Sequence, residues 1–150
     1  MTIEEQIKTG TLPLARKLTI NLLHTAQWAT DILAVTTKSY ELSLQQFNVL
    51  RILRGQKGKP AHLSTINDRM VARASNTTRL VDKLVQKELV QRKTCPSNRR
   101  KIEITITDKG LTLLKEIDIE VTVAETYITG TLNDTEKEQL NTLLNKLRTT

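Results

Sequence analysis

Apolar residues in the N-terminal part of the chain recur with the spacing of a helix. Between residues 12 and 38 they fall every three or four positions and share one face, formed by Leu18, Leu22, Ala26, Ala29 and Leu33. A helix of this length with such a stripe must be covered along most of its length. The pattern therefore predicts extensive packing against other helices.

A second helix is predicted over residues 43–54. Ser43 is a good N-cap, and Gln46, three residues later, completes the spacing of a capping box, in which each residue binds the backbone N–H of the other. The run from Gly55 to Pro60 contains two glycines and a proline, which end the helix.

Two further helices are predicted over residues 62–70 and 73–88, with a tight break between them. Ile66 marks the inner face of the first, and Leu80 and Leu84 mark that of the second. A short helix, a short turn and a longer helix with a polar, basic N-terminal end form the layout of a helix-turn-helix.

A β-hairpin is predicted directly after these helices. Residues 89–95 form one strand, and strict alternation of isoleucine with polar residues predicts a second over 102–107. The connecting loop, 96–101, carries three consecutive basic residues, Arg99, Arg100 and Lys101. Because this hairpin follows a helix-turn-helix, we interpret it as a wing with a positively charged tip.

The C-terminal third is predicted to be helical. Thr107 is a good N-cap for a helix whose apolar pattern continues to Ile128, and Asn133 with Glu136 caps a final, leucine-rich helix. Together with the first helix, these segments carry more apolar surface than one small winged-helix core can absorb. The surplus predicts a homodimer.

Basic residues are concentrated in the middle of the chain. Residues 51–109 contain fifteen Lys and Arg against five Asp and Glu, a net charge of +10, whereas the rest of the chain has a net charge of −3. Such segregation is typical of a site for a polyanion. Nucleic acid is favoured over a membrane, because this segment has no basic amphipathic helix with a bulky apolar face.

The sequence offers little for catalysis or metal binding. It has no Gly-rich phosphate loop or nucleophile elbow, so neither an enzyme nor a cofactor is expected. A redox role for the single cysteine, Cys95, would lack a resolving partner. The acidic N-terminus is unlike a signal peptide and no apolar run is long enough to span a membrane, so we expect a cytoplasmic protein.

Several segments together resemble the MarR family of winged helix-turn-helix regulators. Residues 42–50 are similar to the opening of the family's second helix, and 78–84 followed by 89–92 are similar to its recognition helix and the exit into the wing. Residues 97–100 and 104–110 resemble the wing and the start of the next helix. The resemblance implies a dimeric, mainly α fold with a two-stranded wing that binds double-stranded DNA.

Some residues depart from the family pattern. Asn98 stands where the wing usually has Asp, so we expect it to support the wing by hydrogen bonding without an ion pair. Glu88 replaces a glycine expected before the wing, so that turn is expected to adopt another backbone conformation. Asn67 replaces a small residue in the first helix of the motif, and Val71 replaces a glycine in its turn.

The N-terminal end of the recognition helix is predicted to contact DNA. Arginine pairs well with guanine edges and asparagine with adenine, and a helix N-terminus attracts phosphate. The candidate residues are Arg73, Ser75, Asn76, Thr78 and Arg79. The alternative is structural, with Ser75 capping the helix and Arg79 paired with Asp82 or Asp68.

A second set of candidates flanks this helix. The wing is predicted to reach the minor groove, whose negative potential attracts arginine, and the alternative is a solvated turn. The wing candidates are Asn98, Arg99, Arg100 and Lys101. Ser64 and Thr65 open the preceding helix and either donate to phosphate or cap that helix.

The resemblance also implies an effector site, because the family often binds small anionic or phenolic molecules between its dimer helices and its DNA-binding lobe. His24, Trp28 and Asp31 share one face of the first helix and are the candidates to line such a cleft. The alternative is that Trp28 belongs to the core and His24 lies at the surface.

These observations predict one domain over residues 1–150, with a DNA-binding lobe at about 42–110 and dimerisation helices at about 1–38 and 111–150. The predicted function is a sequence-specific regulator, a repressor relieved by a small-molecule effector, that binds a pseudo-palindromic operator as a homodimer. The alternative is a sequence-tolerant architectural DNA-binding protein. It would lack the preference of roughly 10³-fold that a regulator shows for its operator.

Overall fold

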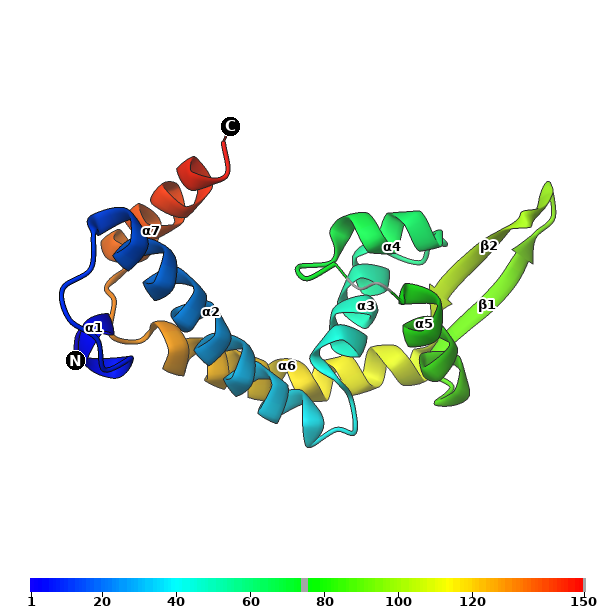
Figure 1. The fold of residues 1–150 in the computed structure, drawn as a ribbon. Coiled ribbons are helices and arrows are strands. Elements are labelled where there is room, and N and C mark those ends of the chain that lie inside the picture. Colours follow the sequence, from blue (N-terminus) through cyan, green and yellow to red (C-terminus); the bar gives the residue numbers. More distant parts are fainter. Residues whose placement is uncertain (74–75, 150) are drawn as a thin grey trace.

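The computed structural model describes residues 1–73 and 76–149, which are mostly helical (Figure 1). Its elements in chain order are α1 (Ile3–Gln6), α2 (Leu14–Lys38), α3 (Leu44–Gly55), α4 (Leu63–Arg69), α5 (Thr77–Gln86), β1 (Val90–Cys95), β2 (Asn98–Ile106), α6 (Asp108–Thr129) and α7 (Asp134–Leu147). The two strands pair as an antiparallel hairpin. The fold is therefore mainly α, with a helix-turn-helix (α4 and α5) followed by a two-stranded wing, as predicted.

One long helix, α6, joins two parts of the molecule. Figure 1 shows α3, α4, α5 and the hairpin around its N-terminal part, whereas α1, α7 and most of α2 lie toward its C-terminal end. We call the first group, with residues 108–121 of α6, the lobe. The second group, with residues 122–129 of α6, is called the arm.

The hydrophobic core lies in the lobe. Its largest fully buried side chains come from α3, α4, α5, β2 and α6 and are Phe47, Leu50, Leu53, Ile66, Leu84, Ile104, Leu114 and Ile117. Burying one such side chain contributes about 1.5–3 kcal/mol relative to leaving it exposed. This cluster therefore holds the helix-turn-helix against α3 and α6.

The arm leaves many apolar side chains exposed. On α6, Val123 and Tyr127 remain open to solvent, with Tyr127 70% exposed, and so does Ile119 in the adjoining part of the lobe. The exposed leucines of α2 and α7 are Leu14, Leu18, Leu22, Leu23, Leu140, Leu143 and Leu147. The predicted apolar stripes of α2 and α7 are therefore largely uncovered in the single chain. The predicted stripe of α6 is mostly buried, and the exposed apolar residues of that helix lie outside it.

Local sequence signals account for most helix starts. Ser43 and Gln46 form the predicted capping box of α3, Asn133 and Glu136 form that of α7, and Thr107 caps α6. Two helices differ from the prediction. The chain has an additional short helix, α1, with its own capping box at Thr2, and α5 begins at Thr77 rather than at residue 73.

The second strand of the hairpin, β2, begins at Asn98 and not at residue 102 as predicted. β1 and β2 are paired from Val90↔Ile106 to Thr94↔Ile102, and the next pair is Cys95↔Asn98. The loop predicted over residues 96–101 is therefore too long, because Pro96 and Ser97 alone reverse the chain. The basic residues Arg99, Arg100 and Lys101 belong to β2, where they fall between two consecutive pairs and bulge out of the ladder.

Ile104 anchors the hairpin to the rest of the lobe. Its side chain is fully buried, and its backbone exchanges two hydrogen bonds with Ala61, at 2.8 and 2.9 Å. Ala61 thus adds a one-residue bridge on the other side of β2. The base of the wing is fixed between β1 and the segment that leads into α4.

The turn between α5 and β1 contradicts one expectation. Glu88 has a φ of 61°, so it adopts the left-handed conformation that a glycine would favour instead of avoiding it. Glu88 N–H donates to the Val85 carbonyl and Leu89 N–H to the Leu84 carbonyl, which together form a Schellman motif. The Thr107 hydroxyl donates to the Glu88 carbonyl at 2.7 Å, so neighbouring residues hold the turn despite its strain.

Gly110 allows α6 to approach the base of the hairpin. A Cβ at this position would lie 2.4 Å from the Leu89 carbonyl oxygen and 2.7 Å from Cγ1 of Ile106. The Leu89 carbonyl cannot retreat easily, because it accepts the Thr107 N–H at 3.0 Å. The space between α6 and the hairpin is therefore sufficient for glycine alone.

We expect Gly110→Ala to lower the free energy of unfolding by about 1–3 kcal/mol, since the added methyl group overpacks this junction. Chemical denaturation measures the change. Gly55→Ala, in α3, is the matched control, because a Cβ there has nothing within 4 Å and alanine favours helix. Equal effects of the two substitutions would contradict the steric role of Gly110.

We expect Glu88→Gly to raise the free energy of unfolding by up to about 1 kcal/mol. The left-handed conformation costs a non-glycine residue about 1–2 kcal/mol, and the greater freedom of glycine in the unfolded chain offsets part of that gain. Glu88→Val should lower stability, because a β-branched residue tolerates positive φ poorly. Lys109→Ala controls for the lost Glu88–Lys109 ion pair, whose two side chains are exposed.

Candidate nucleic-acid interface

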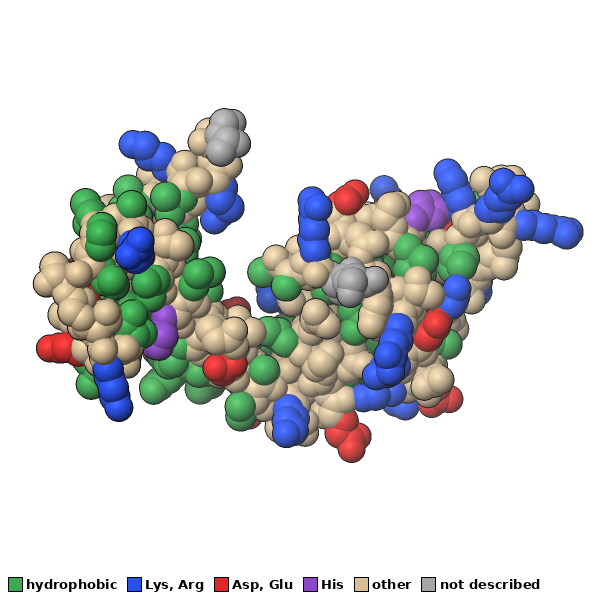
Figure 2. Space-filling view, viewed as in Figure 1, with side chains coloured by type: hydrophobic (Ala, Val, Ile, Leu, Met, Phe, Trp, Pro, Cys, Tyr) green, Lys and Arg blue, Asp and Glu red, His purple; other side chains and the backbone are tan. Residues whose placement is uncertain are grey.

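The helix α5 has one buried face and one exposed, basic face. Thr77, Val81 and Leu84 are buried against the lobe. The exposed side chains at and after its N-terminal end are Asn76, Thr78, Arg79 and Lys83. Figure 2 shows Lys and Arg side chains gathered over the half of the molecule that contains α5 and the wing. The helix therefore presents donors and positive charge to solvent while its opposite face is fixed.

Asn67 connects the two helices of the motif. The buried hydroxyl of Thr77, the first residue of α5, donates to Oδ1 of Asn67 in α4. The departure from a small residue at position 67 thus has a structural consequence. It adds a polar contact that fixes the start of α5 relative to α4.

Two other contacts hold α5 along its length. Asp82 forms an ion pair with Arg92 of β1, and the Lys87 ammonium donates to the backbone carbonyl of Glu41 before α3. The alternative pairing of Arg79 with Asp82 or Asp68 is absent among the described residues. Asp82 is instead paired with Arg92, and Arg79 is exposed.

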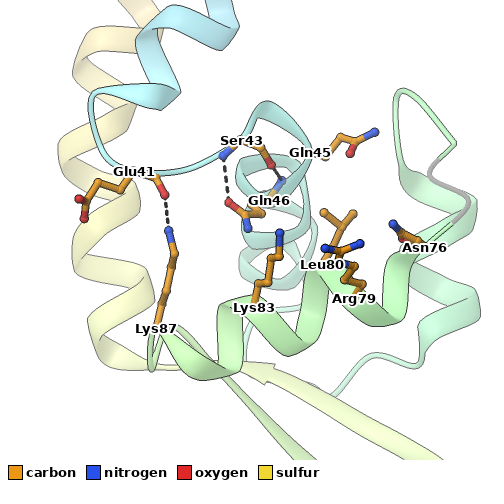
Figure 3. Close-up of a pocket in the computed structure, with 9 residues that line it drawn as sticks. All are labelled: Glu41, Ser43, Gln45, Gln46, Asn76, Arg79, Leu80, Lys83 and Lys87. Carbon is orange, nitrogen blue, oxygen red and sulfur yellow. Dashed lines mark hydrogen bonds between the residues drawn. The ribbon is translucent and has the colours of Figure 1, made fainter.

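A hollow of about 590 Å³ lies between α5 and the N-terminal end of α3. Figure 3 shows Lys83 and Lys87 pointing from α5 toward the segment around Ser43, with Asn76 and Arg79 further along α5. The residues that line it are Glu41, Ser43, Gln45, Gln46, Asn76, Arg79, Leu80, Lys83 and Lys87. Two of the predicted DNA-contact residues, Asn76 and Arg79, are thereby brought together with two lysines that the prediction did not include.

The other candidates near α5 are placed as follows. Thr78 lies on the first turn of α5, and Arg73 is exposed but precedes the helix. Asn76 is the N-cap, and its side chain makes no capping hydrogen bond to the described residues. Ser75 lies outside the described residues, so its predicted roles stay predictions. Arg73 was assigned to the helix because the polar pattern gives no signal that separates the turn from the first helical residue.

In α4, His62 occupies the N-cap position, so neither Ser64 nor Thr65 caps this helix. Ser64 is exposed and Thr65 is half-buried. A smaller hollow, of about 260 Å³, brings Ser64 together with Arg100 and Lys101 of the wing. His62 also lines this hollow and was not among the predicted residues. No local pattern pointed to it, because its contact with the wing is made through Ile102, forty residues away.

The wing candidates are exposed, and their geometry rests on Asn98. Its Oδ1 accepts the backbone N–H of Arg100 at 3.0 Å. Asn98 therefore supports the wing by hydrogen bonding, as expected. Arg99, Arg100 and Lys101 are exposed in the bulge of β2, whereas Cys95 is buried, with Sγ 3.2 Å from the Ser97 hydroxyl.

The proposed effector residues lie in the arm, away from the residues described above. Trp28 is 41% exposed, which excludes a place in the core of the single chain, and its ring centre is 6.3 Å from that of Tyr127 on α6. Asp31 accepts a hydrogen bond from the Gln27 side chain at 2.7 Å, and His24 is exposed. The effector cleft stays a prediction.

Across residues 1–73 and 76–149, no three His, Cys, Asp or Glu residues are grouped so that they could hold a metal ion. No helix in these ranges combines the length and apolar character needed to cross a bilayer.

Comparison with known proteins agrees with this geometry. The model of the MarR family matches residues 42–102, from the start of the α3 cap to the wing. The HTH-type transcriptional regulator MhqR of Bacillus subtilis (strain 168) is 32% identical over 106 residues, which cover 71% of this chain and 72% of that protein.

Solved structures share the fold over almost the whole chain. A MarR transcription factor from Planctomyces limnophilus superposes with a TM-score of 0.71 at 32% identity, covering 91% of this chain and 98% of the other. BpsR of Bordetella bronchiseptica, whose DNA binding is regulated by 6-hydroxynicotinic acid, superposes with a TM-score of 0.81 at 23% identity, covering 94% and 99%. The chain therefore belongs to the MarR family of transcriptional regulators.

Proposed function

We propose that this protein regulates transcription by binding a specific double-stranded DNA site as a homodimer. The observation that carries the proposal is the two-sided character of α5. Its buried face is fixed by Val81 and Leu84, and its free face carries Arg79 and Asn76 beside further positive charge. A rigid helix with such a face fits the major groove, where base edges carry a unique pattern of donors and acceptors.

The residues divide into those that read bases and those that bind the backbone. Arg79 and Asn76 have the side chains that pair bidentately with guanine and adenine edges. Lys83 and Thr78 suit phosphate contacts, which orient a protein on DNA without reading its sequence. Arg73 and Ser64 extend the proposed phosphate contacts on either side of α5.

The wing is proposed to enter the minor groove beside the site of α5. Arg99, Arg100 and Lys101 bulge out of β2 and are exposed, and Asn98 holds the backbone that carries them. Arginine is attracted into a narrow minor groove, where the negative potential is strongest. This contact adds affinity and sensitivity to DNA shape.

The homodimer is supported by the apolar surface of the arm. The leucines of α2 and α7 and the exposed side chains of α6 amount to more apolar surface than isolated chains usually leave in water. A second copy of the chain is the occupant that best fits, because both partners would then cover the same surplus. Two-fold symmetry would also present two α5 helices to a pseudo-palindromic site.

We further propose that binding represses transcription and that a small molecule relieves it. The relative BpsR is regulated by 6-hydroxynicotinic acid, a small aromatic acid. In this chain, Trp28 with Tyr127 offers a half-exposed aromatic pair between α2 and α6, beside His24 and Asp31. An aromatic effector bound there would act on the helices that carry the dimer surface.

The test is fluorescence anisotropy of the purified protein, titrated onto its own upstream intergenic DNA and onto a scrambled duplex at two salt concentrations. Preference for the native fragment by roughly 10³-fold or more supports an operator-reading regulator. Equal binding to both favours the architectural alternative. No binding to either at low salt would contradict a role for the basic segment in nucleic-acid binding.

Arg79→Ala is expected to weaken binding to the native fragment by roughly 5- to 150-fold for each half-site, because one base contact contributes about 1–3 kcal/mol. Binding to scrambled DNA should change much less. Lys101→Ala is the matched comparison. It should weaken both complexes similarly and reduce the salt dependence by about one phosphate contact for each subunit. If both substitutions acted alike on the two duplexes, base reading by α5 would be wrong.

Leu143→Lys is expected to weaken dimerisation by roughly 10²- to 10⁴-fold without unfolding the chain. Leu143 is already 59% exposed in the single chain, and a two-fold interface would lose about 1.5–3 kcal/mol from each of its two copies. Sedimentation velocity over a concentration series measures the change. Thr142→Lys, on the side of α7 turned away from the leucines, should leave the dimer intact. A wild-type chain that stays monomeric would refute the homodimer.

A further inference from the structure

His62 lies where α4 meets the wing. It precedes the first residue of α4, is half-buried, and lines the hollow of about 260 Å³ together with Ser64, Arg100 and Lys101. The other two lining residues are Leu63 and Ile102. The hollow therefore combines one imidazole, one hydroxyl and two permanent cations, which is the donor set of a phosphate site.

The hydrogen bond of the His62 ring determines which nitrogen carries a proton. Nδ1 lies 3.1 Å from the Ile102 carbonyl oxygen. A carbonyl oxygen only accepts, so Nδ1 must be the donor. In the neutral ring, Nε2 then has a lone pair and cannot donate to an anion. In the protonated ring, both nitrogens donate, and Nε2–H becomes available.

The groups that share the hollow with His62 suit a phosphate. Arg100 and Lys101 of β2 are the charged groups that line the hollow, and α4 contributes the Ser64 hydroxyl. The oxygens of a phosphate in the hollow could accept hydrogen bonds from both cations, from the hydroxyl and from a protonated ring, and its negative charge would favour that protonated ring.

We propose that His62, Ser64, Arg100 and Lys101 form a seat for one backbone phosphate of the bound DNA, with protonated His62 donating through Nε2. This inference rests on the proposed function, and it adds His62 as a contact residue and proton uptake as part of binding. It also assigns Arg100 and Lys101 to a backbone phosphate at the edge of the minor groove and leaves Arg99 to enter the groove itself. The Ile102 bond also ties the ring to the strand that carries Arg100 and Lys101. One phosphate would therefore hold α4 and the wing together.

The direction of the pH dependence follows from this arrangement. Because the protonated ring binds DNA better, affinity rises as the pH falls through the range of about 5 to 8 in which histidine titrates. The dependence levels off once the ring is protonated in the free protein. A charge-assisted hydrogen bond of ordinary strength corresponds to roughly a 10-fold change in affinity.

The test compares wild type, His62→Gln and His62→Arg by anisotropy across this pH range, on the native and scrambled duplexes. Glutamine keeps a donor for the Ile102 carbonyl but does not titrate, so its affinity should be independent of pH and weaker than wild type at low pH. Arginine is always charged, so its affinity should stay high and flat. Because phosphate contacts do not read sequence, both duplexes should give the same dependence.

A His62→Gln protein that keeps the wild-type pH dependence overturns the inference and leaves the proposed function intact. Wild-type protein that binds no DNA at any pH overturns the proposed function itself. Thermal unfolding of each variant establishes that it is folded. Should His62→Gln fail to fold, the measurement below decides the question on the wild-type chain.

Imidazole signals in the NMR spectrum report the protonation directly. The chain has two histidines, and the spectrum of His24→Gln assigns them. Adding duplex DNA near neutral pH should move the His62 signal toward its protonated position, and an unchanged signal would overturn the inference. Inorganic phosphate at equal ionic strength should not reproduce the shift. If it does, the site binds free anions and the assignment to a DNA phosphate is wrong.

Discussion

The structure depends on α6, which must bury apolar side chains on two sides. Leu114, Ile117 and Val121 complete the core of the lobe, whereas Ile119 and Val123 point away from it and remain exposed. A helix of 22 residues extends about 33 Å, so it reaches from the hairpin into the arm. One chain can satisfy only one of its two apolar sides. The core of the lobe is therefore complete within one chain, whereas apolar side chains of the arm remain exposed.

The position of α5 is fixed by contacts at its start, middle and end. Thr77 bonds Asn67, Asp82 pairs with Arg92, and Lys87 binds the carbonyl before α3. The two exposed contacts contribute little free energy individually. These contacts instead orient α5, because each of them joins the helix to a different element. The stability of the position comes from the buried side chains of Val81 and Leu84.

Sequence patterns predicted the parts of this fold that local physics decides. The capping boxes at Ser43 and Asn133 and the cap at Thr107 formed where the side-chain spacing placed them, because those bonds involve residues only three positions apart. The apolar stripes of α2 and α7 could also be predicted from the sequence. Their periodicity identifies a face, and the structure confirms that the single chain leaves it open.

Features that depend on tertiary contacts could not be predicted from local sequence patterns. Glu88 was expected to avoid the left-handed conformation, but Thr107, nineteen residues away, donates to its carbonyl and helps to hold it there. The bulge that contains Arg100 depends on where Cys95 and Asn98 pair across the hairpin. His62 was overlooked because its relation to the wing arises only when Ile102 comes alongside.

The lobe cannot turn freely relative to the apolar side of α6. Arg54 of α3 forms a bidentate ion pair with Asp118 of α6, close to the exposed Ile119. In the proposed homodimer, the separation of the two α5 helices would therefore be set by how the α6 helices pack. Half-sites about one helical turn apart, near 34 Å, tolerate little error in that separation. An effector that altered the packing of α2 on α6 would then weaken DNA binding without touching α5, because α6 carries both the apolar side proposed for the dimer and the ion pair that fixes α3 of the lobe.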